Sequence, residues 1–584
     1  MSSIILVATR VSSRYDTGCV QEILMIGRIA QLLETKTGGL HEAAYLLALF
    51  AFLSQLLALV RDRFLAHTFG AGVTLDVYYA AFRIPDFLFV AVASIVSLFV
   101  LIPFLTEKLG ESVLSARRFL SGVTTAFFFF IVVVSVVLFV AMPWLAPRLF
   151  PGFADPDVIE QLIVFTRILL LSPILLGFSN ILAGVTQVFK KFLIYALSPI
   201  VYNIGIIVGI VVLYPTLGTK GLVWGVVLGA LLHLVIQVPS VLREGLLPRL
   251  TRAIDVREVL RVVRVSLPRT AALALNQAAV FALVALASLL PRGSISIFNF
   301  ALNLQGAPLA IIGVSYSVAA FPTLARLFSE GDRGAFLNHM ATAIRHVLFW
   351  SFPAMVLIVV LRAQIVRVVL GSGAFTWSDT RLTAAALALF VASLAAHSLM
   401  LLFVRGYYAS GRTRRPLAVN AFVSGLIILS AYVGTLVFDR VPGIQDFIEA
   451  LLRVSDVPGT AVLVLPLAYS LGMIVNAGMF WFLFRRDFGG HLPRHLYTTL
   501  WQSFSASVIA GGASYVVLQM LASLLDLNTF AGIFTQGLCA GIVGIVVFFV
   551  ILRVTGNREI EEMWGAFRQR FWRAVPVAPE PEEL

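Results

Sequence analysis

Long runs of apolar residues recur along the whole chain and are separated by short polar segments. Each run holds about 20 residues, which is enough to cross a lipid bilayer as an α-helix. Transmembrane β-strands instead alternate apolar and polar residues over about 10 positions. Because these runs are longer and continuous, the pattern predicts an all-α, polytopic membrane protein.

We count fourteen such runs, which predicts 14 transmembrane helices. The predicted spans cover residues 43–65, 76–105, 120–147, 158–187, 192–214, 220–242, 264–290, 295–325, 343–370, 382–408, 416–437, 461–484, 496–525 and 529–553. Composition agrees, since 59% of the 584 residues are hydrophobic and only 12% are charged. No polar segment is long enough for a separate soluble enzyme domain.

The charge balance indicates how the spans are oriented in the membrane. A net charge of +13 could indicate a nucleic-acid partner, but cytoplasmic loops of membrane proteins also collect Lys and Arg. The C-terminal tail and the loops after even-numbered spans hold 27 of these residues, and the loops after odd-numbered spans hold 10. This bias predicts that both termini are cytoplasmic, and it explains most of the positive charge without nucleic acid.

Two segments of the chain resemble each other and predict an internal repeat. FLFVAVASIVSLFVLIPFLTEKLGES (87–112) and GAPLAIIGVSYSVAAFPTLARLFSEGD (306–332) each join an apolar helix to Pro-x-Leu and a polar turn. Six spans in each repeat would insert both halves the same way up, as in transporters that bind substrate between parallel repeats. The predicted parts are an extension (1–41), an N-lobe (42–242), a basic linker (243–263), a C-lobe (264–485), two further helices (486–554) and a tail (555–584).

Two shorter segments have one apolar face and predict helices that lie on the membrane surface. In 444–454, Ile444, Phe447, Ile448 and Leu451 share a helical face. The tail segment 558–575 has the same pattern among arginines. We expect the first helix on the outer side and the second on the cytoplasmic side.

Six charged residues interrupt the apolar pattern in the stretch RDRFLAHTFGAGVTLDVYYAAFRIPDF (61–87). They are Arg61, Asp62, Arg63, Asp76, Arg83 and Asp86. A charge at the bilayer centre costs about 2.5–3.5 kcal/mol, so such residues usually face a protein interior or a wet cavity. Arg83 and Asp86 share a helix face. The alternative is that these charges cap helix ends at the outer interface and pair with one another, which we favour for Arg63. Arg167, alone in the fourth span, either lines the cavity or pairs with a carboxylate.

No motif in the sequence indicates an enzyme. There is no phosphate-binding Walker loop and no HExxH metal motif. His491 and His495 are four residues apart, but Pro493 lies between them, so a surface loop is the better interpretation. Cys19 and Cys539 are too few for a disulfide framework. We expect no metal and no cofactor.

Four segments together point to a known family, and they are RDRFLAHTFGAGVTLDVYYAAFRIPD, PGFADPDVIEQL, GVTQVFKKFLIYALSPIVYNIGIIVG and GVSYSVAAFPTLARLFSEGD. They are similar to the MurJ-type lipid II flippases of the MOP exporter superfamily. The resemblance runs from about residue 42 to 553. It implies fourteen helices, with two six-helix lobes around a central cavity and two more helices that form a lipid-facing groove. It also implies transport of an undecaprenyl-pyrophosphate-linked peptidoglycan precursor from the inner to the outer leaflet.

The resemblance also implies which residues line the cavity. The Arg-Asp pair at the end of the first helix is present as Arg61 and Asp62, and the aspartate after the turn is present as Asp76. Three family arginines are replaced, and the positions carry Gln55, Phe89 and Asn303. With these replacements, the predicted substrate-binding or gating residues are Gln55, Arg61, Asp62, Asp76, Arg83, Asp86, Arg167 and Asn303.

Three alternatives stay open at this point. The chain could export another lipid-linked sugar or act as a drug/cation antiporter, which the missing arginines favour. It could instead be a non-transporting scaffold for cell-wall enzymes, although a scaffold has no need for intramembrane charge. The third, a membrane glycosyltransferase, is disfavoured because the loops lack an acidic donor-binding motif.

The expected partners are a lipid-linked cell-wall precursor, membrane lipids and cell-wall synthesis proteins. A coupling ion or the membrane potential would drive transport. We expect a multi-pass protein of the bacterial plasma membrane.

The charge bias generates a test of topology. We expect an impermeant thiol reagent to label Asp446→Cys in intact cells, because the 438–460 loop is predicted to be outside. Gln569→Cys should be labelled only after the cells are opened. Labelling at 569 but not at 446 in intact cells would overturn the predicted orientation.

Overall fold

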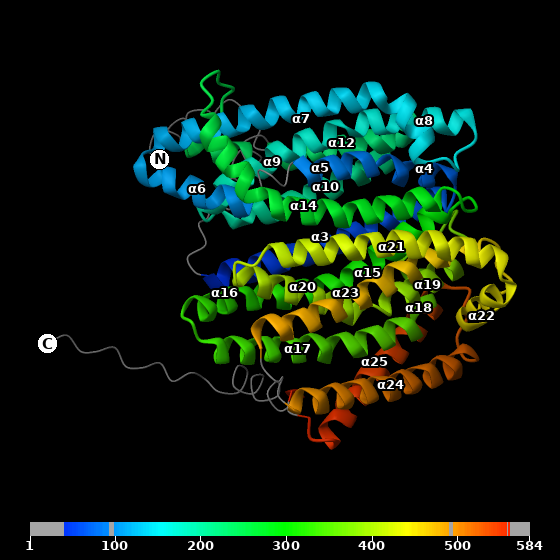
Figure 1. The fold of residues 1–584 in the computed structure, drawn as a ribbon. Coiled ribbons are helices and arrows are strands. Elements are labelled where there is room, and N and C mark those ends of the chain that lie inside the picture. Colours follow the sequence, from blue (N-terminus) through cyan, green and yellow to red (C-terminus); the bar gives the residue numbers. More distant parts are fainter. Residues whose placement is uncertain (1–39, 93–97, 490–493, 558, 561–584) are drawn as a thin grey trace, which may run out of the picture. The chain divides into compact units, whose positions relative to one another are not determined.

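The apolar runs fold into helices throughout the part of the chain that the structure describes (Figure 1). This structure is a computed structural model, and it describes residues 40–92, 98–489, 494–557 and 559–560. These residues contain helices and turns and no β-strand. The prediction of an all-α membrane protein is therefore confirmed.

Eleven helices in the described part are long and apolar enough to cross a membrane. The number becomes twelve if α19 (Trp377–Val391) and α20 (Leu394–Ala409), which meet at a 44° bend, form one span. The exact count of fourteen is not confirmed. One reason is that the predicted second span, 76–105, is divided among three helices, α4 (Val73–Ala81), α5 (Arg83–Val92) and α6 (Leu98–Glu111).

The break between α4 and α5 has a local cause. It falls at Phe82, three residues before Pro85. Proline has no backbone N–H, and its ring clashes with the carbonyl four residues earlier, here that of Ala81. The chain restarts as a helix at Arg83, so this charged residue stands in the first turn of α5.

The chain divides into two compact units. Unit 1 comprises residues up to Phe64, Ala80–Leu149 and Ala154–Gln277. Its helices are α3 (Leu40–Phe69) up to Phe64, α5, α6, α7 (Val113–Leu149), α8 (Pro156–Leu169), α9 (Leu171–Val188), α10 (Phe192–Val208), η2 (Gly209–Leu213), α11 (Tyr214–Leu217), α12 (Lys220–Val235), α13 (Val238–Arg243) and α14 (Val256–Ala287) up to Gln277.

Unit 2 comprises Leu65–Tyr79, Phe150–Phe153 and the residues from Ala278 onward. It contains most of α4, the end of α14, and every later helix. These are α15 (Ser294–Leu309), η3 (Ala310–Val314), α16 (Ser315–Ser329), α17 (Arg333–Val360), α18 (Arg362–Leu370), α19, α20, α21 (Arg414–Arg440), α22 (Pro442–Leu452), η4 (Thr460–Leu463), α23 (Val464–Phe488), α24 (Arg494–Ala522) and α25 (Phe530–Val554). The predicted lobe boundaries stay predictions.

The predicted outer surface helix corresponds to α22. Ile444, Phe447 and Leu451 are exposed on it, so its apolar face is available to lipid. Most of the predicted tail helix 558–575, the extension up to residue 39 and His491 lie outside the described residues.

Glycines set the packing of α10, η2 and α12 inside unit 1. Gly205 and Gly209 face Gly229 and Gly225, and a Cβ atom added at any of them would overlap the backbone of the facing helix. Small residues allow close approach of helices where apolar lipid provides no hydrophobic driving force. This close packing fixes the position of α10, which carries polar residues of the candidate functional site.

We expect Gly225→Val to lower the stability of the protein, because the new side chain must push η2 away. Overpacking of this kind costs about 1–3 kcal/mol. The measurement is the unfolding midpoint of the purified protein beside its abundance in the membrane. Gly110→Ala is the control, since nothing lies within 4 Å of a Cβ atom at that position. Equal midpoints for the wild type and Gly225→Val would contradict the packing argument.

Candidate functional site

A polar cluster in unit 1 begins with the Arg-Asp pair at the end of α3. The Nε and Nη2 groups of Arg61 donate hydrogen bonds of 2.9 and 2.7 Å to Oδ1 of Asp62. Its Nη1 group donates a longer bond, 3.2 Å, to Oδ1 of Asn203 on α10. The Asp62 carboxylate is 3% exposed and the Arg61 side chain 20% exposed. Asp62 therefore fixes the plane of the guanidinium, and Asn203 ties it to a second helix.

Asn203 is itself held by two further groups. Its Nδ2 group donates to the Pro199 carbonyl at 3.1 Å and to the Ser54 hydroxyl at 3.5 Å. The amide oxygen consequently faces Arg61, which is the orientation needed to accept a hydrogen bond. Sequence reasoning missed Asn203, although an amide side chain inside an apolar run is a recognisable signal.

Arg83 and Asp86 complete the cluster from α5. Arg83 is buried, and Asp86, one turn later, lies close enough to interact with its charge. Tyr202, next to Asn203 on α10, interacts electrostatically with both Asp86 and Arg61 and forms a side-chain hydrogen bond with Ser172 of α9. Helices α3, α5, α9 and α10 thus gather two arginines and two aspartates around Tyr202 and Asn203. Their formal charges sum to zero.

Asp76 belongs to unit 2 and has a different environment. Its carboxylate accepts hydrogen bonds from the Gly293 N–H (2.6 Å), the Ser296 N–H (2.8 Å) and the Ser296 hydroxyl (2.7 Å). These groups open α15, where backbone N–H groups have no partner within the helix. Gly293 has a φ of +90°, a conformation that glycine adopts without steric cost. Asp76 therefore caps α15, and its negative charge suits the positive end of the helix dipole.

Three positions carry neutral residues where the family resemblance leads us to expect arginine, and these positions do not all lie in the same unit. Gln55 on α3 and Phe89 on α5 are half-buried in unit 1. Asn303 on α15 is half-buried in unit 2. The structure thus places Gln55 and Phe89 on the helices that carry the polar cluster.

Arg167 lies apart from the polar cluster, on α8. Its Nε group donates to the Phe139 carbonyl at 3.0 Å, and the guanidinium lies 4.6 Å from the centre of the Phe139 ring. It lines an apolar hollow of about 570 Å³ with Val136 and Trp224, both of which are exposed. Within the described residues its partners are a carbonyl and a ring, rather than the carboxylate considered as an alternative.

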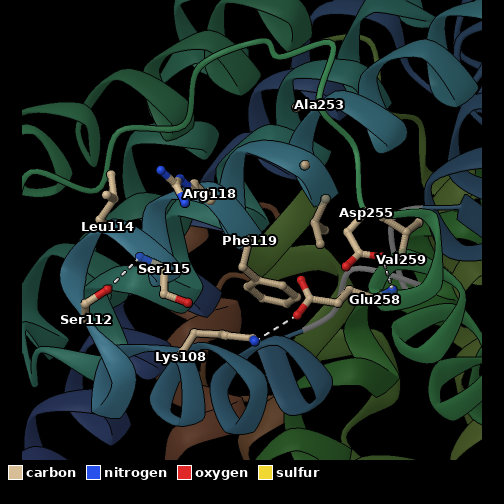
Figure 2. Close-up of a pocket in the computed structure, with 12 residues that line it drawn as sticks. Lys108, Ser112, Leu114, Ser115, Arg118, Phe119, Ala253, Asp255, Glu258 and Val259 are labelled. Carbon is tan, nitrogen blue, oxygen red and sulfur yellow. Dashed lines mark hydrogen bonds and ion pairs between the residues drawn. The ribbon is translucent and has the colours of Figure 1, made fainter.

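A polar pocket of about 320 Å³ in unit 1 lies where α6, α7 and α14 meet (Figure 2). Lys108 and Glu258 point toward each other and form an ion pair of 2.8 Å. The Asp255 carboxylate accepts from the backbone N–H groups of Arg257 and Glu258 and caps α14. The hydrogen bond with Glu258 raises the pKa of Lys108 above its ordinary value. This pocket ties the end of α6 to the start of α14.

No set of three or more His, Cys, Asp or Glu side chains that could hold a metal ion occurs in the part of the chain described. Cys539 is a free thiol.

Comparison with known proteins gives a consistent result. The sequence model of a family described as "Lipid II flippase MurJ" matches residues 65–535. The match includes Asp76, Arg83, Asp86 and Asn303 and begins after Arg61 and Asp62. A probable lipid II flippase MurJ of Rickettsia prowazekii is 27% identical over 68% of this chain and 78% of its own length. The lipid II flippase MurJ of Burkholderia cenocepacia is 24% identical over 66% of this chain and 76% of its own.

Solved structures show the same fold. A lipid II flippase MurJ in an inward closed conformation aligns with a TM-score of 0.71 and 22% identity, covering 88% of this chain and all of that one. An inward-facing multidrug resistance MATE family transporter of the MOP superfamily aligns with a TM-score of 0.59 and 14% identity, covering 74% of this chain and 94% of that one.

The geometry of Asp76 generates a stability prediction. In Asp76→Ala three donors at the start of α15 lose their acceptor, and each buried unsatisfied group costs about 1–3 kcal/mol. We expect a clearly lower unfolding midpoint for this variant. Asp446→Ala, on the exposed side of α22, is the matched control. An unchanged midpoint combined with lost transport would indicate that Asp76 contacts substrate and that the cap is dispensable.

Proposed function

Because the chain belongs to the MurJ family of lipid II flippases, we propose that it moves lipid II from the cytoplasmic to the outer leaflet of the plasma membrane. Lipid II is a polyprenyl-diphosphate-linked peptidoglycan precursor. The observation that carries the proposal is the family match over residues 65–535, supported by the MurJ-like fold. A hydrophilic headgroup cannot cross lipid unaided. Alternating access lets it pass through the protein while the polyprenyl tail stays in the bilayer.

The polar cluster of unit 1 is the part best suited to the diphosphate. A guanidinium offers planar, fixed N–H donors that match phosphate oxygens. Arg61 is already oriented by Asp62, so little conformational freedom is lost on binding. A phosphate oxygen would replace Asn203 as the acceptor of Nη1, because that bond is the longest of the three. Arg83, one helix away, would supply the second cation.

The aspartates have a different role in this proposal. Without substrate, Asp62 and Asp86 balance the charges of Arg61 and Arg83, which reduces the cost of keeping these residues among apolar spans. When a diphosphate binds, its negative charge competes with the carboxylates for the arginines. Binding is thereby coupled to a change in the pairing of charges, which is a basis for a transition between inward- and outward-open states.

The remaining candidate residues receive separate roles. Gln55 and Asn303 would offer neutral hydrogen bonds to the sugar or peptide of the headgroup. Asp76 would hold α15 in place. Arg167, bound to the Phe139 carbonyl beside exposed apolar residues, would not contact the headgroup.

The family consists of transporters, and the chain is a multi-pass membrane protein. We propose that both termini are cytoplasmic and that cell-wall synthesis proteins contact the loops. Likeness to the MATE transporter shows the fold alone at 14% identity, so drug export gains no support from it. The buried charges of the polar cluster are unexplained by a scaffold function.

The proposal is tested by replacing Arg61. Arg61→Ala removes the charge-assisted bonds to the diphosphate, each worth about 1.5–3 kcal/mol, so we expect flipping to fall by at least about tenfold. Arg61→Lys keeps the charge without the planar fork and should be partly active. The measurement is the leaflet in which lipid II accumulates after depletion of the wild-type protein, in cells that express each variant.

Arg63→Ala is the matched control on the same helix and should flip normally. Membrane abundance of every variant is measured in parallel, because a loss of protein would mimic a loss of transport. Normal flipping by Arg61→Ala at wild-type abundance would contradict the assignment of the headgroup to this cluster.

A further inference from the structure

A third pocket, in unit 2, has a strongly cationic lining. It has a volume of about 330 Å³ and is lined by residues of α18, α19, α24 and α25 and by the end of α22. Three arginines line it, Arg362, Arg381 and Arg453. None of the residues predicted from the sequence to bind substrate lies among its lining residues.

The three arginines have unequal partners. Arg381 forms two bonds of 2.6 Å with the carboxylate of Asp456 and is neutralised by it. Arg362 donates to the carbonyls of Val359 (2.9 Å) and Leu452 (3.4 Å). Arg453 donates to the hydroxyl of Tyr515 at 3.3 Å. Among the described residues, Arg362 and Arg453 thus bind only neutral acceptors, and their like charges repel each other. The pocket has an excess of two positive charges.

The backbone of Arg453 adds independent evidence. This residue ends α22 in the left-handed conformation, with φ +60° and ψ +50°. Glycine is the usual residue at such a helix end, because a side chain is strained there. Within the described residues, Lys190 is the only other residue besides glycine with positive φ. An arginine at a position where glycine fits better points to a use for its side chain.

The surroundings indicate where the ligand comes from. Phe447 and Leu451 on α22 are 66% and 64% exposed, and Leu524, after α24, is 76% exposed. Exposed apolar side chains next to arginines are typical of the boundary between acyl chains and lipid headgroups. Lipid headgroups at this boundary carry phosphate groups, which two cationic side chains can bind.

We propose that this pocket binds the phosphate group of an anionic phospholipid. Arg362 and Arg453 would donate charge-assisted hydrogen bonds to the phosphate oxygens, which relieves the repulsion between the two guanidinium groups. Trp377 and Leu527, which also line the pocket, offer apolar contact to the glycerol and the first carbons of the acyl chains. The bound lipid would join α18 and α22 to α24 and so stabilise this part of unit 2. The inference does not depend on the identity of the transported substrate.

The test uses the purified full-length protein in nanodiscs that contain equal amounts of phosphatidylglycerol and phosphatidylcholine. Lipids that stay bound after release from the nanodisc are counted by native mass spectrometry. We expect the wild type to retain phosphatidylglycerol selectively. Arg362→Gln and Arg453→Gly should each reduce that selectivity by about tenfold, the factor that corresponds to 1.4 kcal/mol.

Arg453→Gly is informative because it removes the charge and also relieves the backbone strain, so loss of binding cannot be attributed to misfolding. Arg453→Lys should keep most of the selectivity. Arg440→Gln is the matched control, since Arg440 is an exposed arginine at the end of α21 that does not line the pocket. Selectivity that is equal in the wild type and in both pocket variants would overturn the proposal.

A second arm separates a lipid from a free anion. Inorganic pyrophosphate is titrated against the protein in lipid-free detergent, and the fluorescence of Trp377 is isolated as the difference between the wild type and Trp377→Phe. Weak or absent binding of pyrophosphate, with selective retention of phosphatidylglycerol, supports the lipid assignment. Tight binding of pyrophosphate without selective lipid retention would show a site for a soluble anion and would overturn it.

Discussion

Water is absent from the interior of a bilayer, so a charged or polar group there must find its partner within the protein. The described residues meet this constraint in several ways. Arg61 bonds to the neighbouring Asp62 and to an amide on another helix. Asp76 bonds to the open end of a helix. Arg345 reaches the buried Glu559 at 3.4 Å, which fixes the chain after α25 to α17. In each case the partner of the charged group determines which helices are held together.

Charged residues in this protein differ in whether a ligand could replace their present hydrogen-bond partners. Asp76 has three donors that are part of one helix terminus, and no ligand can take their place without opening α15. Arg61 bonds to Asn203 through the longest of its three hydrogen bonds to Asp62 and Asn203, and this is the bond that we propose a phosphate oxygen replaces. Arg362 and Arg453 have only neutral acceptors within the described residues. Whether a charged residue serves the fold or is available to a ligand therefore depends on what its partners are.

The sequence alone was sufficient to predict the features that depend on residues close together in the chain. Residues within a few turns of each other determine the all-α architecture, most of the spans and the apolar face of α22. Sequence reasoning could not find partners that lie far apart in the chain, such as Asp76 and Ser296 or Lys108 and Glu258, because hydrophobic periodicity contains no information about which helices are neighbours. Tyr202 and Asn203 were missed for a related reason. They are neutral, and a search for intramembrane charge passes over them although they join Arg61 to Asp86.

The cap on α15 also has a consequence for biosynthesis. Asp76 and Gly293 are 217 positions apart. At about 5–20 residues per second, the ribosome needs about 10–40 s to make the intervening chain. During that interval the carboxylate of Asp76 has no helix terminus to bind, although the apolar segments on both sides of it have already left the ribosome. The contact between α4 and the start of α15 therefore forms only after α15 has been made, and until then water or other groups must satisfy the Asp76 carboxylate.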